Sequence, residues 1–271
     1  MSENLTFYQE VGEKIEKYIR PATFPLAIKL IKDESEVPPD SKRPSVDLKV
    51  QNFMCQDFKM ARTYGWTITV SADDINCKLA RGVFGWESAV TEESQELLHK
   101  FNIGLYAKDL ETSKKLEKHL LSLGNKFWGL VISPLTRTKV EPDVVLIYCL
   151  PAQAMRLVQS YLFCEGGVLK FTAAGRIGSC HDGVIKTYLT KKPQFVLLGN
   201  GDRVWGGAQD SEVMFSCPRE KLDPLVKGLE ATHAAGLRYP IPSYMNYAPG
   251  FQAAFQKKAY KRAGGTIVKE K

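Results

Sequence analysis

The chain has 271 residues, 44% of them hydrophobic and 25% charged, a composition typical of a globular protein that can bury a sizeable core. The formal net charge is +7, but the last fifteen residues carry six Lys or Arg and one acid, which leaves 31 basic and 29 acidic residues in the rest. The body of the sequence has no basic patch with interleaved aromatic residues, so we expect no nucleic-acid partner.

The N-terminal segment lacks a positively charged stretch followed by an apolar run, so it does not resemble a secretion signal. No segment approaches the roughly 20 apolar residues that a membrane-spanning helix requires. We therefore expect a cytoplasmic protein with no membrane partner. In a reducing cytoplasm the six cysteines are free thiols that serve as packing residues or ligands.

Apolar periodicity predicts the elements of the first half of the chain. In chain order they are a helix over 6–19, a strand over 25–31, a loop over 34–44, a helix over 50–63, a strand over 66–70, a short helix over 73–80, and two polar helices over 91–101 and 109–123. Pro21 and Gly65 are the residues expected to end the first two helices.

The second half alternates strands with helices in the same way. It is predicted to contain strands over 129–133 and 143–150, a helix over 151–163, strands over 168–173, 195–198 and 212–217, and helices over 181–190 and 219–235. The strand over 143–150 is apolar throughout, which is typical of a central strand. Pro151 fits the first turn of the helix that follows it.

A repeated pattern indicates an internal duplication. Cys55-Gln-Asp57 and Cys180-His-Asp182 each follow an apolar strand, and each precedes a Thr-Tyr pair and a further strand. We therefore predict an α+β fold, a single compact unit over 1–245 with mixed sheets and flanking helices. Its two similar halves would be 1–105 and 106–245, and a basic tail would follow over 246–271.

Several strings together resemble one protein family. They are Pro25-Leu-Ala-Ile-Lys29, the helix around Cys55, Asn76-Cys77, Pro142-Asp-Val-Val-Leu-Ile147, Pro151-Ala-Gln-Ala-Met-Arg-Leu157, Asn200-Gly-Asp-Arg203 and Gly228-Leu-Glu230. Over about residues 5–245 the chain is similar to the bacterial and archaeal family of unknown function 169, also called the uncharacterised ArCR family. The resemblance implies a stand-alone cytoplasmic protein of mostly anaerobic or archaeal organisms. It also places Cys55 and Cys77 at the family's N-terminal cysteine positions.

Cysteine is the residue type that could carry chemistry here. We predict a metal or iron–sulfur site built from Cys55, Cys77, Cys180 and Cys164, because thiolates are the preferred ligands of soft metals and of such clusters. His181 could add a nitrogen ligand. No two cysteines form a C-x-x-C pair, so burial as small apolar residues remains the alternative, and it is the one we favour for Cys149 and Cys217, a strand residue and a strand end.

A nucleophilic site is a second possibility, because Cys180 directly precedes a histidine and an aspartate. Neighbours in sequence point in different directions, so adjacency alone does not make a triad.

An anion site is a third possibility. Glycine-rich turns over 175–178 and 199–203 could present backbone N–H groups, with Arg176 and Arg203 as clamps for a phosphate or carboxylate. Gln153 and Arg156, in the first turns of their helix, are further candidate cofactor-binding residues. Ordinary turns have the same composition. The aromatic residues Tyr64, Trp66, Phe84, Trp86, Trp128 and Trp205 could line a pocket or pack in the core.

The leading functional hypothesis is a cysteine-ligated iron–sulfur or metal-binding protein of anaerobic redox metabolism, either an enzyme or an accessory protein. The alternative is a non-catalytic binder of an anionic small molecule such as a nucleotide or a CoA-like compound. The expected partner is accordingly a small-molecule ligand or a redox partner protein.

Overall fold

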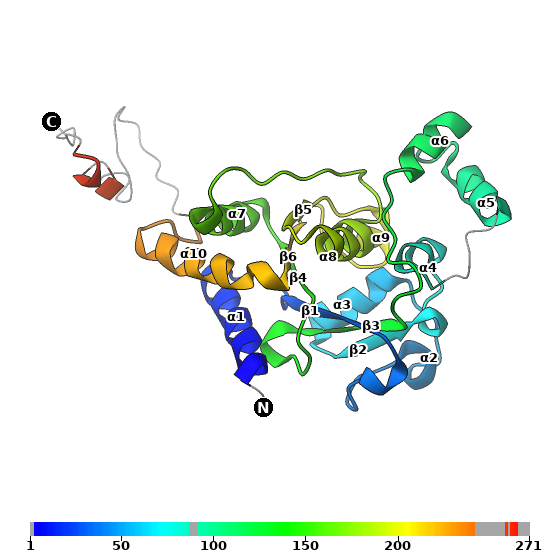
Figure 1. Cartoon of the computed structure of the whole chain (residues 1–271), viewed down its shortest axis with the longest axis horizontal. Coiled ribbons are helices and arrows are strands. Elements are labelled where there is room, and N and C mark those ends of the chain that lie inside the picture. Colours follow the sequence, from blue (N-terminus) through cyan, green and yellow to red (C-terminus); the bar gives the residue numbers. More distant parts are fainter. Residues whose placement is uncertain (1–2, 87–91, 242–257, 260, 265–271) are drawn as a thin grey trace.

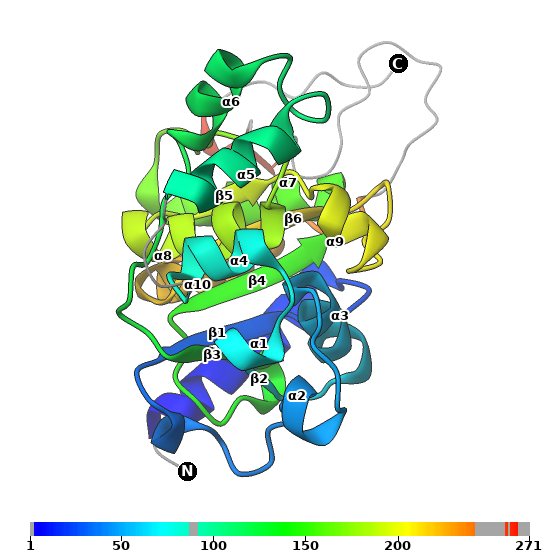
Figure 2. The same cartoon turned by 90° about the vertical axis from the view of Figure 1, so that its right-hand side faces the viewer.

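One six-stranded sheet lies between two layers of helices (Figures 1 and 2). The computed structural model describes residues 3–86, 92–241, 258–259 and 261–264. The basic tail predicted over 246–271 therefore lies mostly outside the described residues. No helix in the described ranges is both long and apolar enough to cross a membrane.

The strands are β1 (Leu26–Ile31), β2 (Ile68–Ser71), β3 (Gly129–Pro134), β4 (Val144–Cys149), β5 (Gln194–Val196) and β6 (Val213–Pro218). The helices are α1 (Glu3–Ile19), α2 (Pro44–Asp47), α3 (Met54–Tyr64), α4 (Lys78–Phe84), α5 (Glu92–Asn102), α6 (Leu110–Glu117), α7 (Pro151–Glu165), α8 (Lys186–Thr190), α9 (Asn200–Val204) and α10 (Leu222–Ala234). A π-helix, η4 (Gly178–Ile185), runs directly into α8. Short 3₁₀ turns are η1 (Glu34–Glu36), η2 (Ala72–Asp74), η3 (Leu135–Arg137) and η5 (Arg219–Lys221).

The sheet has the strand order β2-β3-β1-β4-β6-β5, and neighbouring strands pair antiparallel. The predicted α+β class is confirmed, with a single antiparallel sheet instead of mixed sheets. The strand over 143–150 is also confirmed as central, because β4 pairs with both β1 and β6 and all six of its residues are buried.

The strand order is symmetric about the β1–β4 pair. From that pair outward, one side runs β1, β3, β2 and the other runs β4, β6, β5, so each side has the same order of its own first, third and second strand. The predicted halves, 1–105 and 106–245, divide the sheet differently. β3 lies at Gly129–Pro134 but pairs between β1 and β2, so it completes the N-terminal side of the sheet. The similarity of two halves stays a prediction.

Alternate strand residues face opposite ways, which produces two cores. One core packs α1, α7 and α10 against the sheet. The other packs α3, α4 and η4 against the opposite face. The pair α5 and α6 stands off the sheet at one end of the molecule, as Figure 1 shows.

Two predicted elements differ from the structure. No strand forms over 168–173. That segment crosses from α7 to η4 as an exposed connection in which Val168 is 72% exposed, so it has no neighbouring strand to pair with. The helix predicted over 109–123 ends at Glu117, and the backbone N–H of Leu121 instead donates to Nε2 of His181.

Candidate functional site

Two of the predicted ligand cysteines meet on one face of the sheet. Cys55 lies in the first turn of α3, and Cys180 is the third residue of η4. A hydrogen bond joins their side chains. Cys180 is 4% exposed, whereas Cys55 is only partly buried, so solvent reaches the pair from the Cys55 side.

Cys77 is the third thiol of this region and immediately precedes α4. Its sulfur accepts hydrogen bonds from the backbone N–H groups of Leu79 and Ala80. Cys77 lies close enough to the pair to interact electrostatically with both Cys55 and Cys180. We call Cys55, Cys77 and Cys180 the thiol cluster.

The backbone around Cys180 is unusual in two respects. η4 is a π-helix of eight buried residues, and π-helical segments occur frequently at functional sites. Ile177, directly before it, has φ 53° and ψ 45°, in the left-handed region that β-branched residues rarely adopt. Such strain persists only where the surrounding structure imposes it.

Close backbone packing imposes that conformation. A Cβ atom at Gly199 would lie 3.1 Å from Cα of Arg176, and one at Gly178 would lie 2.7 Å from the carbonyl oxygen of Leu197. The connection between β5 and α9 therefore packs closely against the start of η4. A side chain at Gly178 would require the backbone to shift, and one at Gly199 would make a tight contact.

A buried carboxylate lies beside the cysteine pair. Asp202 is 4% exposed and accepts hydrogen bonds from the backbone N–H groups of Gly199 at 2.9 Å and Ser179 at 3.3 Å. The hydroxyl groups of Ser179 and Tyr148 lie 2.7 Å apart.

The outer wall is formed by α9 and by the residue before α3. A Cβ atom at Gly201 would lie 3.3 Å from Sγ of Cys55, so the sulfur packs directly against the α9 backbone. Phe53 and Trp205 stack with ring centroids 4.6 Å apart and planes inclined by 4°. Trp205 is 44% exposed and borders this side of the cluster.

Negative neighbours keep the proton on the buried thiol. The hydrogen bond to Cys55, burial, and the charges of Cys55, Cys77 and Asp202 raise the pKa of Cys180 well above its ordinary value. Burial is the main cause of the raised pKa of Cys77, and the charge of Cys55 adds to it. A cation in this place would meet several groups that can become negative.

His181 is not available to the thiols. Its Nε2 accepts the N–H of Leu121 at 2.8 Å, and its Nδ1 lies 2.9 Å from Oδ1 of Asp182. Because both ring nitrogens are engaged, the histidine can act neither as a base for Cys180 nor as an additional metal ligand without breaking these contacts.

The other cysteines lie on the opposite side of the sheet. Cys164 is exposed near the end of α7, where it acts electrostatically on Lys227 of α10. The structure does not bring this predicted ligand to the thiol cluster. Cys149 and Cys217 are strand residues in the core beneath α7 and α10, as expected, and burial raises the pKa of Cys149 to about 12.

The four predicted cofactor-binding residues are each engaged in internal contacts. Arg176 donates to Asn102 at 2.9 Å and Glu117 at 2.6 Å, which ties α5 and α6 to the body of the protein. Arg203 donates to the carbonyl oxygen of Gln209.

The two candidates on α7 face its neighbouring helices. Gln153 donates to the carbonyl oxygens of Ile19 and Arg20, and Arg156, 2% exposed, donates to Thr232 of α10. Their polar atoms join α7 to α1 and α10. The predicted anion turn over 199–203 is likewise occupied internally, because Asp202 accepts the N–H of Gly199.

The family comparison agrees with the extent of the fold. The model of the family described as uncharacterised ArCR, domain of unknown function 169, matches residues 14–228. The chain belongs to this family. The ArCR match spans all six strands and the whole thiol cluster.

One relative is similar over most of the chain. The uncharacterised protein MJ0308 of Methanocaldococcus jannaschii is 30% identical over 210 residues, which is 76% of this ArCR chain and 86% of that protein. No solved structure matches the chain.

Two features of this ArCR protein's site were missed by sequence reasoning. Asp202 was assigned to an ordinary or anion-binding turn, and Gly201 had no assigned contact. A turn that also approaches a cysteine in space carries no local sequence signal. The Cys-x-Asp repeat at 55–57 and 180–182 related the two cysteines to each other but did not include Asp202.

No group of three or more His, Cys, Asp or Glu side chains within the described ranges is arranged to hold a metal ion as it stands. The cluster is therefore a close pair, Cys55 and Cys180, with Cys77 as a neighbour that would have to reorient to share a ligand with them.

Proposed function

We propose that this ArCR protein binds a thiophilic metal ion or an iron–sulfur cluster through Cys55, Cys77 and Cys180, and that the resulting centre serves a redox reaction. The observation that carries the proposal is the contact between Cys55 and Cys180, which are 125 positions apart in the sequence. Direct contact between two thiols is the arrangement that shared ligation of a soft metal requires.

The electrostatics support a cation more than a nucleophile. Loss of protons from the pair would place two negative charges beside each other and beside Asp202, in a largely buried site. A metal cation replaces the thiol protons and compensates those charges. A nucleophilic cysteine needs positive neighbours that lower its pKa, whereas Cys180 has negative neighbours that raise its pKa.

Ligation by Cys77 has an identifiable cost. Its sulfur must turn toward the pair, which breaks its hydrogen bonds with the N–H groups of Leu79 and Ala80. Metal–thiolate bonding outweighs such a loss, since apparent binding energies of thiolate-containing structural sites are about 10 kcal/mol or more, against about 1 kcal/mol for an ordinary hydrogen bond.

The test is metal and sulfide analysis of protein purified without oxygen. We expect metal in the wild type, a loss of most of it in Cys55→Ser and Cys180→Ser, and a partial loss in Cys77→Ser. Cys164→Ser is the matched control and should retain the full content, because that thiol lies on the other side of the sheet. Equal metal content in the wild type and the Cys55 and Cys180 variants, or none in the anaerobic wild type after reconstitution, would refute the proposal.

A second function, thiol–disulfide exchange, is favoured by the same direct contact. The Cys55 sulfur would attack the disulfide of a partner protein and expel one partner thiolate. With Cys55 uncharged in the mixed disulfide, the Cys180 thiol would give its proton to the first expelled thiolate and attack the Cys55 sulfur. It would thereby expel the second thiolate and leave a Cys55–Cys180 disulfide. In metal-free protein, treatment with a disulfide should therefore remove two titratable thiols from the wild type and from Cys164→Ser. It should not remove two thiols from Cys180→Ser.

A further inference from the structure

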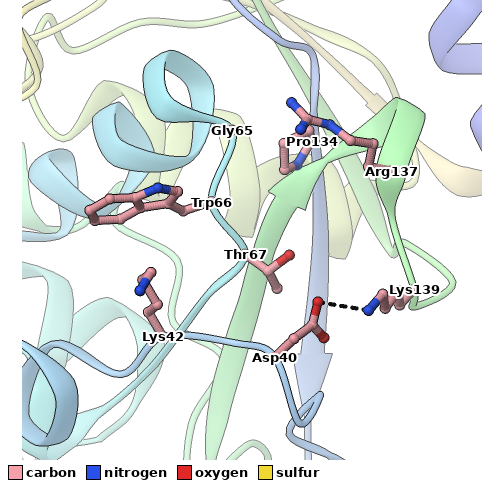
Figure 3. A pocket seen from close by; sticks show the side chains of 8 residues that line it. All are labelled: Asp40, Lys42, Gly65, Trp66, Thr67, Pro134, Arg137 and Lys139. Carbon is pink, nitrogen blue, oxygen red and sulfur yellow. Dashed lines mark hydrogen bonds and ion pairs between the residues drawn. The ribbon is translucent and has the colours of Figure 1, made fainter.

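A basic pocket lies at the far end of α3 from the thiol cluster. It has a volume of about 310 Å³ and is lined by Asp40, Lys42, Gly65, Trp66, Thr67, Pro134, Arg137 and Lys139 (Figure 3). Gly65 follows the last residue of α3, whereas Cys55 lies in its first turn. At 1.5 Å per residue the two places are about 15 Å apart along the helix.

Three cations line this pocket against one acid. Lys139 pairs with Asp40 at 2.7 Å. Lys42 lies over the Trp66 ring, 4.9 Å from its centroid, and the Arg137 guanidinium lies over Phe24 at 4.6 Å. Neither of these two cations has a salt-bridge partner among the described residues, although Glu16 is near enough for the charge of Arg137 to act on its pKa.

The backbone holds the lining in place. Lys42 and the start of β2 exchange two backbone hydrogen bonds, from the N–H of Lys42 to Thr67 and from the N–H of Thr69 to Lys42, each 2.9 Å long. Arg137 ends a 3₁₀ turn directly after β3. In Figure 3 the Thr67 hydroxyl lies between Trp66 and Lys42 on one side and Arg137 and Lys139 on the other.

We propose that this pocket binds a phosphorylated small molecule. Arginine offers planar paired donors suited to phosphate oxygens, and Lys42 and Lys139 supply additional charge. The Thr67 hydroxyl is a further donor, and Trp66 offers apolar surface to the rest of the molecule. The volume is at the lower end of the range for ligand pockets, which fits a sugar phosphate better than a whole dinucleotide.

The site differs from the anion turns expected from the sequence, whose arginines are engaged internally. It is also independent of the proposed metal centre, because no cysteine lines it. Loss of metal in a cysteine variant should leave phosphate binding unchanged.

The test is calorimetric titration of the full-length protein with inorganic phosphate, glucose 6-phosphate and the dicarboxylate malate. We expect saturable binding, tightest for the sugar phosphate. Arg137→Gln and Lys42→Gln should each weaken it on the order of tenfold. Lys108→Gln is the matched control, because it removes the same charge from a side chain that is 83% exposed in the α5–α6 connection, and it should bind like the wild type.

A gain-of-affinity variant separates binding from a structural role. Asp40→Asn removes the one acid among the lining residues and frees Lys139, so sugar phosphate should bind several times more tightly. Unaltered binding in Arg137→Gln and Lys42→Gln, or no saturable binding of either phosphate, would overturn the proposal. Tighter binding of malate than of glucose 6-phosphate would overturn the phosphate assignment. Unchanged thermal unfolding midpoints verify that the variants are folded.

Discussion

Asp57 is a carboxyl group buried in the inner part of α3. Asn52 donates to its Oδ1 at 2.8 Å, and its Oδ2 has no hydrogen-bond partner within the described part of the chain. Burial raises the pKa of Asp57 from 3.8 to about 8, and the charge of Asp74 adds to this shift. At neutral pH the folded protein therefore holds a proton here that the unfolded chain releases.

This proton makes stability depend on pH in a definable direction. Below about pH 4 both states are protonated, and between about pH 4 and 8 only the folded state is, so the free energy of unfolding falls as pH rises through that window. Asp57→Asn removes the effect while keeping the bond from Asn52. We expect it to be more stable than the wild type by roughly 1–3 kcal/mol at pH 8 and nearly equal at pH 4.

Urea unfolding at the two pH values measures the difference. The exposed Asp73→Asn is the control and should follow the wild type at both. Parallel pH profiles for wild type and Asp57→Asn would contradict the buried, protonated carboxyl group.

Residue types in the sequence indicated the thiol cluster only in part. The chemistry of cysteine singled out Cys55, Cys77 and Cys180, and the structure places these three near one another. Cysteine chemistry alone could not separate Cys164 from these three, because tertiary packing decides which side of the sheet α7 covers. Arg176 and Arg203 were chosen for their glycine-rich surroundings, yet their partners, Glu117 and Gln209, are set by long-range and loop geometry.

At the scale of elements, α7 and α10 approach each other closely at one glycine. A Cβ atom at Gly228 would lie 1.8 Å from the backbone carbonyl oxygen of Ser160. Gly228→Ala must therefore push the helices apart, and we expect a loss of about 1–3 kcal/mol in the free energy of unfolding.

Gly82 in α4 provides a matched comparison for that substitution. A Cβ atom there meets nothing within 4 Å, so Gly82→Ala should stabilise the protein by about 0.5–1 kcal/mol through helix propensity alone. Denaturant unfolding measures the free energy of unfolding of both variants. Equal effects of the two alanines would show that the close contact of α7 with α10 does not govern stability.

Elements with strong local signals were predicted well. β4 is apolar along its whole length, and Pro151 marks the start of α7. The π-helix was not predicted, because the sequence from Gly178 to Ile185 suits an ordinary helix, and its wider winding accompanies the packing of Gly178 and Ile177 against the 197–199 connection. The apolar residues over 168–173 predicted a strand, but among the described residues this segment has no neighbouring strand to pair with.

At the scale of the whole molecule, a metal held by Cys55 and Cys180 would connect α3 with η4 and so join two distant parts of the chain. Binding to the folded state alone stabilises it by mass action, about 4 kcal/mol at a thousandfold excess over Kd. For the metal-free wild type we expect Zn²⁺ or Cd²⁺ to raise the thermal unfolding midpoint by about 5 °C or more.

The same additions to Cys180→Ser should have a much smaller effect, and Cys164→Ser should respond like the wild type. Scanning calorimetry with and without a chelator makes the comparison. An equal rise in all three proteins would place the metal elsewhere.

Helix α3 has a consequence for how the two proposed sites can be occupied. Its first turn carries Cys55, and the residue that closes it, Gly65, borders the basic pocket. The two places share this helix but no lining residue, and about 15 Å of helix separates them. A phosphorylated molecule and a metal ion can therefore occupy the protein together without competing for a single side chain.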